Sequence, residues 1–150
     1  MRQPPEQRAA YRHFLPITTR WGDNDAYGHV NNVTYYSWFD TVVNQLLISR
    51  GVLDIHGSDV IALVIETGCN YFSSVAFPDR VTAGLRVARL GTSSIRYEIA
   101  IFRDDDDHAA AQGHLVHVCV EREGRRPTPM PVPMHQLLSS LLTIIDTTEP

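Results

Sequence analysis

The chain has 150 residues, 43% of them hydrophobic, which is typical of one globular domain that buries its own core, and we expect a single domain over residues 1–150. Its formal net charge of -4 and pI near 5.9 provide no overall attraction to nucleic acid or to an anionic membrane. No apolar run approaches the roughly 18 residues that a membrane span needs. Cys69 and Cys119 lie in apolar segments, as expected for buried thiols in a reducing compartment. These features predict a cytoplasmic protein that binds neither nucleic acid nor membranes.

The predicted elements begin after a polar N-terminal stretch. Residues 1–10 include Pro4 and Pro5 and are expected to form a flexible tail. Residues 13–21 partly alternate and carry β-branched side chains, which predicts a first strand. Between residues 33 and 50, apolar side chains recur three and four positions apart, the spacing of one helix face, and Gly51 supplies the C-terminal stop. A helix of about 30 Å with so wide an apolar face needs other elements wrapped around it.

Four strand-like segments follow the helix and can wrap around it. Residues 60–72, 80–90, 93–102 and 109–122 are rich in apolar and β-branched residues, and short turns separate them. Because connections this short favour hairpins, we expect an antiparallel meander, followed by a short helix over residues 134–145. The simplest architecture consistent with this order is a curved antiparallel sheet of about five strands around one long helix, which makes the fold class α+β.

A polar motif, RWGDNDAYGHVNN, occupies residues 20–32, between the first strand and the helix. Asn31 and Asn32 are both suitable N-caps, since a short amide side chain accepts a hydrogen bond from a first-turn N–H group. Asp25 and His29 therefore precede a helix N-terminus, whose remaining free N–H groups can hold a polarised carbonyl or an oxyanion. A carboxylate beside such donors indicates acyl transfer.

Each motif residue also has a purely structural alternative. Asp25 serves either as a general base that activates water or as a nucleophile that forms an acyl anhydride, and its alternative is an Asx turn. Asp23 is assigned to turn formation. His29 either orients the substrate or relays a proton, because an imidazole exchanges protons near neutral pH. Its alternative is a loop histidine hydrogen-bonded to the backbone.

Other candidates lie outside the core of the motif. Tyr35 is a candidate wall of an acyl pocket, although aromatic residues at helical spacing more often belong to the core. Glu66 interrupts an apolar run and would be costly if buried without a partner, so we expect it to face a polar site or cavity and count it among the candidate substrate-binding residues. Arg125 and Arg126 form a basic turn suited to phosphates, and their alternative is ordinary solvated surface. His114 and His117 are three apart on a strand and so cannot chelate one metal together.

The order strand, Gly-Asp-x-Asp, His-Val-Asn-Asn, long helix and four strands resembles the hotdog fold, specifically the 4-hydroxybenzoyl-CoA thioesterase and acyl-carrier thioesterase family. The resemblance covers residues 13–135. It implies that Asp25 is the catalytic carboxylate, that His29 acts in catalysis, and that the helix start at Asn31 and Asn32 holds the thioester carbonyl. Tyr27 stands where those enzymes tend to have Asn, and we count it among the substrate-binding residues.

The same resemblance implies an assembly and a substrate. Family members form homodimers, often tetramers, with sites shared across the interface, and basic residues meet the phosphates of CoA, a role that falls here on Arg125 and Arg126. The sequence thus predicts an enzyme that hydrolyses CoA or acyl-carrier thioesters with no cofactor and no metal. The alternative is a hotdog module that binds acyl-CoA without turning it over. Retention of both Asp25 and His29 favours the enzyme.

Overall fold

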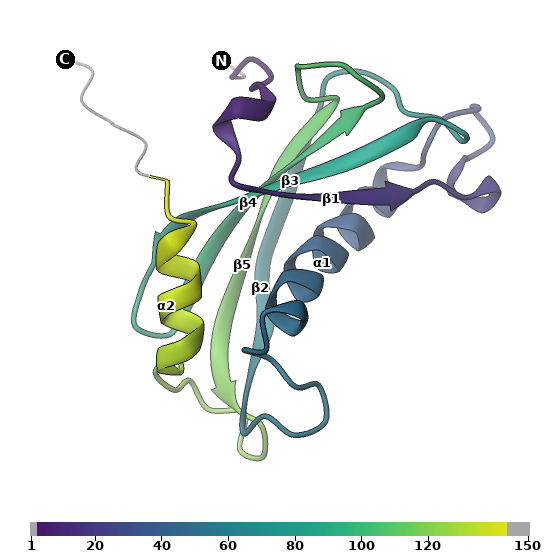
Figure 1. The fold of residues 1–150 in the computed structure, drawn as a ribbon. Coiled ribbons are helices and arrows are strands. Elements are labelled where there is room, and N and C mark those ends of the chain that lie inside the picture. The colour runs from purple at the N-terminus through teal and green to yellow at the C-terminus, as the bar shows by residue number, and fades with distance from the viewer. Residues whose placement is uncertain (1–2, 144–150) are drawn as a thin grey trace.

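The computed structural model describes residues 3–143, and its longest helix, α1 (Asn32–Ser49), lies against the concave face of a five-stranded sheet (Figure 1). Asn31 is the N-cap, and its Oδ1 accepts the Val33 N–H at 2.9 Å. Gly51, with a φ of 72°, ends the helix as predicted. The buried side chains recur at helical spacing: Tyr35, Trp38, Phe39, Val42, Val43, Leu46 and Leu47.

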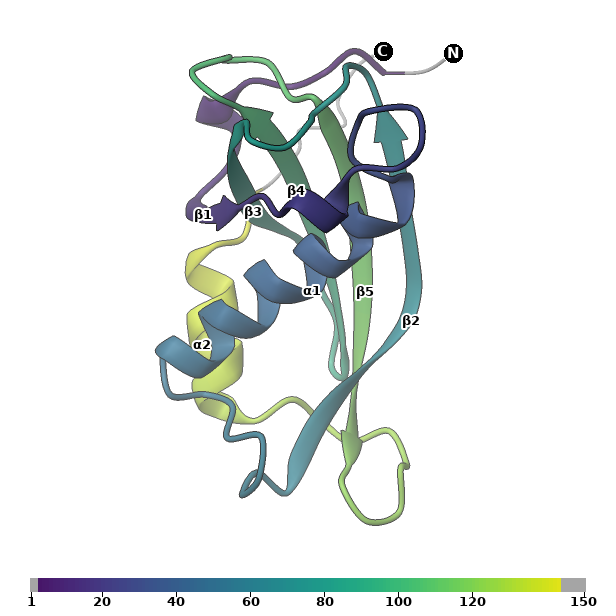
Figure 2. The same ribbon diagram turned by 90° about the vertical axis from the view of Figure 1, so that its right-hand side faces the viewer.

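The sheet contains β1 (His13–Thr18), β2 (Val60–Tyr71), β3 (Arg80–Leu90), β4 (Ser94–Arg103) and β5 (Ala111–Glu121). Its strand order is β1-β3-β4-β5-β2, and every neighbouring pair is antiparallel. Figure 2 shows α1 crossing the sheet on its concave side. The predicted α+β architecture, a curved sheet around one long helix, is confirmed.

The predicted meander is correct for β3, β4 and β5 and wrong for β2. Instead of pairing with β3, β2 lies at the far edge beside β5, and residues 72–79 cross over to β3. Three strand spacings amount to about 14 Å. Eight extended residues reach about 26 Å, so a connection that looked like a hairpin turn is long enough to cross the sheet. This crossover brings the end of β2 next to the start of α1.

Both helices pack closely on the sheet. A Cβ on Gly113 of β5 would meet the Gly68 carbonyl oxygen and would lie 2.7 Å from a ring carbon of Phe39, so α1 approaches because this side chain is absent. The second helix, α2 (Val132–Ser140), buries Met134 and Leu138 against the same core. It ends at Ser140, five residues before the predicted end, and residues 144–145 lie outside the described range. None of the described helices is both long and apolar enough to cross a membrane.

The N-terminal segment differs from the flexible tail that the sequence predicts. Residues 3–10 lie across the convex face of the sheet and include a short 3₁₀-helix, Arg8–Ala10. The Glu6 N–H donates to Gln112 Oε1 at 2.9 Å, and the Glu6 carboxylate pairs with Arg86 at 2.7 Å. These bonds hold the segment against the sheet, which composition alone did not indicate. Residues 1–2 lie outside the described range. Both Cys69 and Cys119 are free thiols, Cys119 buried and Cys69 half-buried.

Candidate active site

Asp23 fixes both ends of the motif loop. Its side chain is fully buried, and its carboxylate accepts the backbone N–H of Arg20 at 2.8 Å and the guanidinium at 2.8 and 3.0 Å. Its backbone carbonyl accepts the N–H of Asn31, the N-cap of α1, at 3.0 Å. Because Arg20 occupies both carboxylate oxygens, Asp23 acts as a structural anchor that holds loop 24–30 against the helix start.

Loop 24–30 is a tight hairpin that presents Asp25. The Asp25 N–H donates to the His29 carbonyl at 3.0 Å, and the Gly28 N–H donates to the Asp25 carbonyl at 3.1 Å. Gly28 has a φ of 86°, a conformation that glycine adopts without steric cost. The Tyr27 N–H donates to Asp25 Oδ1 at 2.9 Å, so the Asx turn does form. It uses one oxygen only, and Oδ2 has no hydrogen-bond partner among residues 3–143.

His29 is exposed at the end of this hairpin. Within the described part of the chain its ring makes no hydrogen bond, which argues against the purely structural alternative. The ring stacks on Tyr27, with 6.5 Å between centroids. Tyr27 is 86% exposed and stands outside the pocket lining, so in one chain its side chain contacts the site only through His29, although its backbone N–H bonds Asp25.

The start of α1 supplies a free backbone donor beside Asp25. The Val33 N–H is capped by Asn31 Oδ1, and the Thr34 N–H donates to the Asn31 carbonyl at 3.0 Å. The Asn32 N–H has no partner among the described residues. Asn31 is therefore committed to capping, and Asn32 carries the donor that the helix dipole leaves available for an oxyanion.

A pocket of about 300 Å³ opens between this segment and the end of β2. Its lining comes from the motif, the first turn of α1 and the start of the crossover: Asp25, His29, Val30, Asn32, Tyr35, Tyr71, Phe72, Ser73 and Ser74. Of the predicted site residues, Asp25, His29, Asn32 and Tyr35 line this pocket, whereas Tyr27 and Asn31 do not. The wall formed by residues 71–74 was not predicted, because only the crossover brings that wall to the motif.

Two tyrosines join the walls of this pocket. Tyr71 Oη donates to the Asn32 carbonyl at 2.9 Å, which ties the end of β2 to the start of α1. Its ring packs edge-on against Tyr35, with 5.0 Å between centroids. Tyr35 is buried, and burial raises its pKa to about 12; burial also raises the pKa of Tyr71. Both phenols are therefore neutral at physiological pH and act as hydrogen-bonding walls.

The remaining sequence candidates lie elsewhere. Glu66 is on the face of the sheet turned away from α1, where His114 Nε2 lies 2.9 Å and Arg96 3.6 Å from its carboxylate. It adjoins a polar cavity, as expected, but not the pocket that holds Asp25. Arg125 and Arg126 are exposed, with Arg126 paired to Glu121 at 3.2 Å. Because Glu121 pairs with Val60, they lie at the opposite end of β2 from Tyr71.

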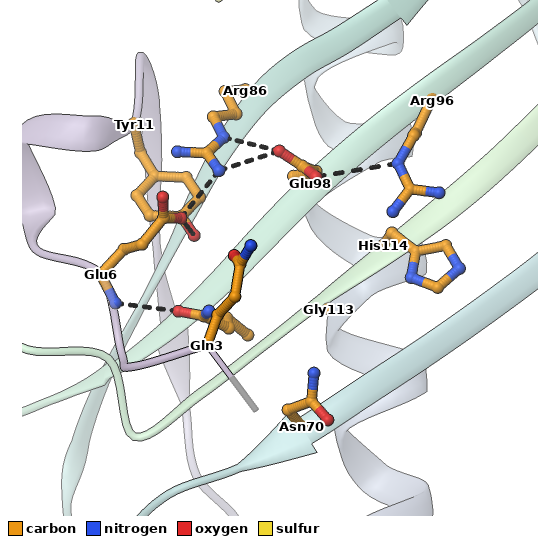
Figure 3. A pocket seen from close by; sticks show the side chains of 10 residues that line it. Gln3, Glu6, Tyr11, Asn70, Arg86, Arg96, Glu98, Gly113 and His114 are labelled. Carbon is orange, nitrogen blue, oxygen red and sulfur yellow. Dashed lines mark hydrogen bonds and ion pairs between the residues drawn. The ribbon is translucent and has the colours of Figure 1, made fainter. Parts of the chain in front are cut away.

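That polar cavity, about 430 Å³ in volume, lies between the N-terminal segment and the convex face of the sheet (Figure 3). Arg86 is only 5% exposed; it bonds Glu98 at 2.8 Å and Glu6 at 2.7 Å and stacks over Tyr11. Arg96 approaches Glu98 at 3.7 Å. With Glu66 at its rim, the cluster has more carboxylates than guanidinium groups. It therefore lacks the net positive charge that would hold the phosphates of CoA.

Residues 19–138 match the model of the thioesterase-like superfamily. The PA5185 protein of Pseudomonas aeruginosa strain PAO1 has a solved structure that is 54% identical, covers 93% of this chain and 98% of its own, and superposes with a TM-score of 0.91. PA2801 of Pseudomonas aeruginosa, which carries a predicted thioesterase assignment, is 31% identical over 83% of this chain and 96% of its own, with a TM-score of 0.77.

A more distant structure shares the fold alone. The DHNA-CoA thioesterase of Staphylococcus aureus is 20% identical over 85% of this chain and 87% of its own, with a TM-score of 0.75. No curated protein matches the sequence. The family match spans most of the chain, including the motif loop, α1 and all strands from β2 to β5. The chain therefore belongs to the thioesterase-like superfamily and is a hotdog-fold thioester hydrolase.

Proposed function

We propose that this protein hydrolyses a CoA or acyl-carrier thioester to the free acid and thiol in the pocket between α1 and the end of β2. The observation that carries this proposal is that Asp25 and Asn32 line one pocket, and that one Asp25 carboxylate oxygen and the Asn32 N–H have no hydrogen-bond partner among residues 3–143. A carboxylate beside a preorganised backbone donor is the arrangement that acyl transfer requires.

Asp25 acts on the thioester carbonyl by one of two routes. As a general base, it takes a proton from water while the oxygen of that water attacks the carbonyl carbon. As a nucleophile, its free oxygen attacks the same carbon, and water then hydrolyses the resulting anhydride. In both routes the carbonyl oxygen becomes negatively charged beside the Asn32 N–H, and the carbon–sulfur bond breaks to release a thiolate. His29, in the same lining, orients the thioester or protonates the departing sulfur.

A homodimer formed through β2 is part of the proposal. β2 is an edge strand with exposed apolar side chains, and Ile65 is 62% exposed. Such an edge is unfavourable in water, and pairing with β2 of a second copy about a two-fold axis covers it. Strands paired in this way run antiparallel, so the partner's Val60 end lies beside the Tyr71 end of the first copy.

This dimer would bring Arg125 and Arg126 near a pocket. Within one chain they are separated from the pocket by the length of β2, roughly 40 Å for twelve residues. In the antiparallel dimer, the same turn of the partner approaches the pocket, where its charges meet CoA phosphates. We also infer a cytoplasmic location, which the two free cysteines support.

The function is tested with a panel of CoA and acyl-carrier thioesters, with the released thiol measured by a disulfide reagent. We expect turnover of at least one substrate by the wild-type chain and its loss in Asp25→Asn. Binding of acyl-CoA without thiol release across the panel would contradict the proposal and would identify a binding module.

A further inference from the structure

Asn24 connects the two walls of the pocket through a bond that lies outside the pocket lining. Its Oδ1 accepts the Phe77 N–H of the crossover at 2.9 Å, in a partly buried position. A second bond between the same segments is formed by the backbone alone, from the Val30 N–H to the Val75 carbonyl at 2.7 Å. Asn24 also forms a bridge with Val30, which closes the hairpin behind Asp25.

The two pocket walls carry different functional groups. Asp25, His29 and Asn32 lie on the motif side, whereas Tyr71, Ser73 and Ser74 lie on the crossover side. The bond from the Asn31 N–H to the Asp23 carbonyl holds the motif loop to the start of α1. Within the loop, Asp25 is fixed by the Tyr27 N–H and by its own N–H bond to the His29 carbonyl, and none of these bonds uses the Asn24 side chain. Loss of the Asn24 side chain would therefore loosen one wall against the other. The positions of Asp25, His29 and Asn32 relative to one another would be unchanged.

We propose that Asn24 is a positioning residue that sets the separation of the two pocket walls, and thereby the affinity for substrate. The chemical step is governed by the separate bonds that fix Asp25 within the motif loop and that loop to α1. This assignment rests on the proposed thioesterase function, since affinity is read from the hydrolysis of thioesters. It assigns to the variable position of the Gly-Asp-x-Asp motif a role in binding that is distinct from that of either flanking carboxylate.

The kinetic test is Asn24→Ala. Because the bond contributes equally to the ground state and the transition state, we expect KM to rise about five-fold with kcat within about two-fold of wild type. Asn24→Asp retains the accepting oxygen, and its KM should stay near wild type even if the added charge beside Asp25 changes kcat. The matched control is Asn44→Ala, which removes a 2.8 Å side-chain bond to the Asp40 carbonyl on α1, away from the pocket lining.

Amide hydrogen exchange tests whether the Asn24 side chain holds the two pocket walls together, and it does not depend on enzyme activity. In Asn24→Ala the Phe77 N–H should exchange at least about ten-fold faster, and the Val30 N–H should lose protection with it, whereas Asn24→Asp should retain both. If Asn24→Ala does not fold, Asn24→Ser, whose hydroxyl is too short to reach Phe77, takes its place.

The outcomes are separable. A wild-type chain that hydrolyses no thioester contradicts the proposed function, and the exchange rates still show whether Asn24 clamps the walls. Unchanged exchange, unchanged KM, or a kcat loss above about ten-fold with KM unchanged would each overturn the role assigned to Asn24.

Discussion

Asp25 lines the pocket, and one of its carboxylate oxygens accepts the Tyr27 N–H at 2.9 Å, whereas the other has no hydrogen-bond partner in the described range 3–143. Asp25→Asn retains an oxygen for that turn bond but removes both basicity and nucleophilicity. We expect kcat to fall by about 10² to 10⁴, the usual contribution of a positioned base, while binding largely survives. Steady-state thiol release, together with CoA-thioester binding by calorimetry, measures the two quantities separately.

The control for this substitution is Asp104→Asn rather than a change at Asp23. Asp104 Oδ1 also accepts a backbone N–H, that of Arg80 at 2.9 Å, and it does not line the pocket. Asp23 is unsuitable because its carboxylate is buried with Arg20, and losing that charge would destabilise the loop. Equal losses of kcat in Asp25→Asn and Asp104→Asn would remove Asp25 from the chemistry.

His117 is a buried histidine whose charged form the core does not accommodate. It is 3% exposed, its Nδ1 has no hydrogen-bond partner among the described residues, and burial lowers its pKa to about 4. An unfolded histidine has a pKa of about 6.5. Between these values the unfolded chain binds more protons than the folded chain. Stability therefore falls as the pH falls from about 6.5 towards about 4.

We expect His117 alone to reduce the free energy of unfolding by about 2 kcal/mol between about pH 7 and about pH 5. Urea unfolding of the wild type and of His117→Leu at both pH values isolates this contribution, because the other titrating groups are common to the two proteins. An identical pH dependence in the two proteins would show that His117 does not titrate in this way.

Local sequence was sufficient to predict that Asp25, His29 and Asn32 lie close together, because a hairpin and a helix cap depend on residues only a few positions apart. Tyr71 was not predicted, since it reaches the Asn32 carbonyl only through the position of β2 at the far edge of the sheet. Glu66, expected to face a polar site, lies on the side of the sheet turned away from the Asp25 pocket. Which face of the sheet it occupies depends on strand register and on the irregularity between Val64 and Glu66, which a pattern of hydrophobicity does not show.

At the scale of elements, α1 and the strands were predictable because each buries an apolar face with a regular period. The order of the strands was not, since residues 72–79 are compatible with either a hairpin or a crossover. The crossover is stabilised by the motif loop, through the bonds from Val30 to Val75 and from Phe77 to Asn24. The loop that carries Asp25 therefore also helps to fix the topology of the sheet.

Close packing of α1 on β5 predicts the effect of a single methyl group. In Gly113→Ala the new Cβ would lie 2.7 Å from the Phe39 ring and even closer to the Gly68 carbonyl oxygen, which belongs to the backbone. We expect a loss of about 1–3 kcal/mol in the free energy of unfolding, measured by urea denaturation. Gly22→Ala is the control, since nothing lies within 4 Å of its Cβ position. Equal stability of Gly113→Ala and wild type would mean that α1 does not pack this closely.

For the whole molecule, the central question is whether one chain contains a complete site. The pocket residues and the basic turn lie at opposite ends of the β2–β5 pair, as the pairing of Tyr71 with Ala111 and of Val60 with Glu121 requires. A single chain therefore offers the reacting groups without Arg125 and Arg126. The antiparallel dimer proposed above joins the two ends, and it predicts that each site draws Asp25 from one copy and the basic turn from the other.

This arrangement predicts complementation between two defective proteins. One carries Asp25→Asn, and the other carries Arg125→Ala with Arg126→Ala, which should raise KM for CoA thioesters with little change in kcat. After unfolding and refolding an equal mixture, half of the dimers are mixed. If the sites are shared, each mixed dimer has one intact site, so about a quarter of all sites regain the wild-type KM. Refolded mixtures assayed at low substrate concentration, with sedimentation to verify the dimer, measure this fraction. If Arg125 and Arg126 serve the pocket of their own chain, no mixed dimer has an intact site, and the mixture shows only the average of its two components.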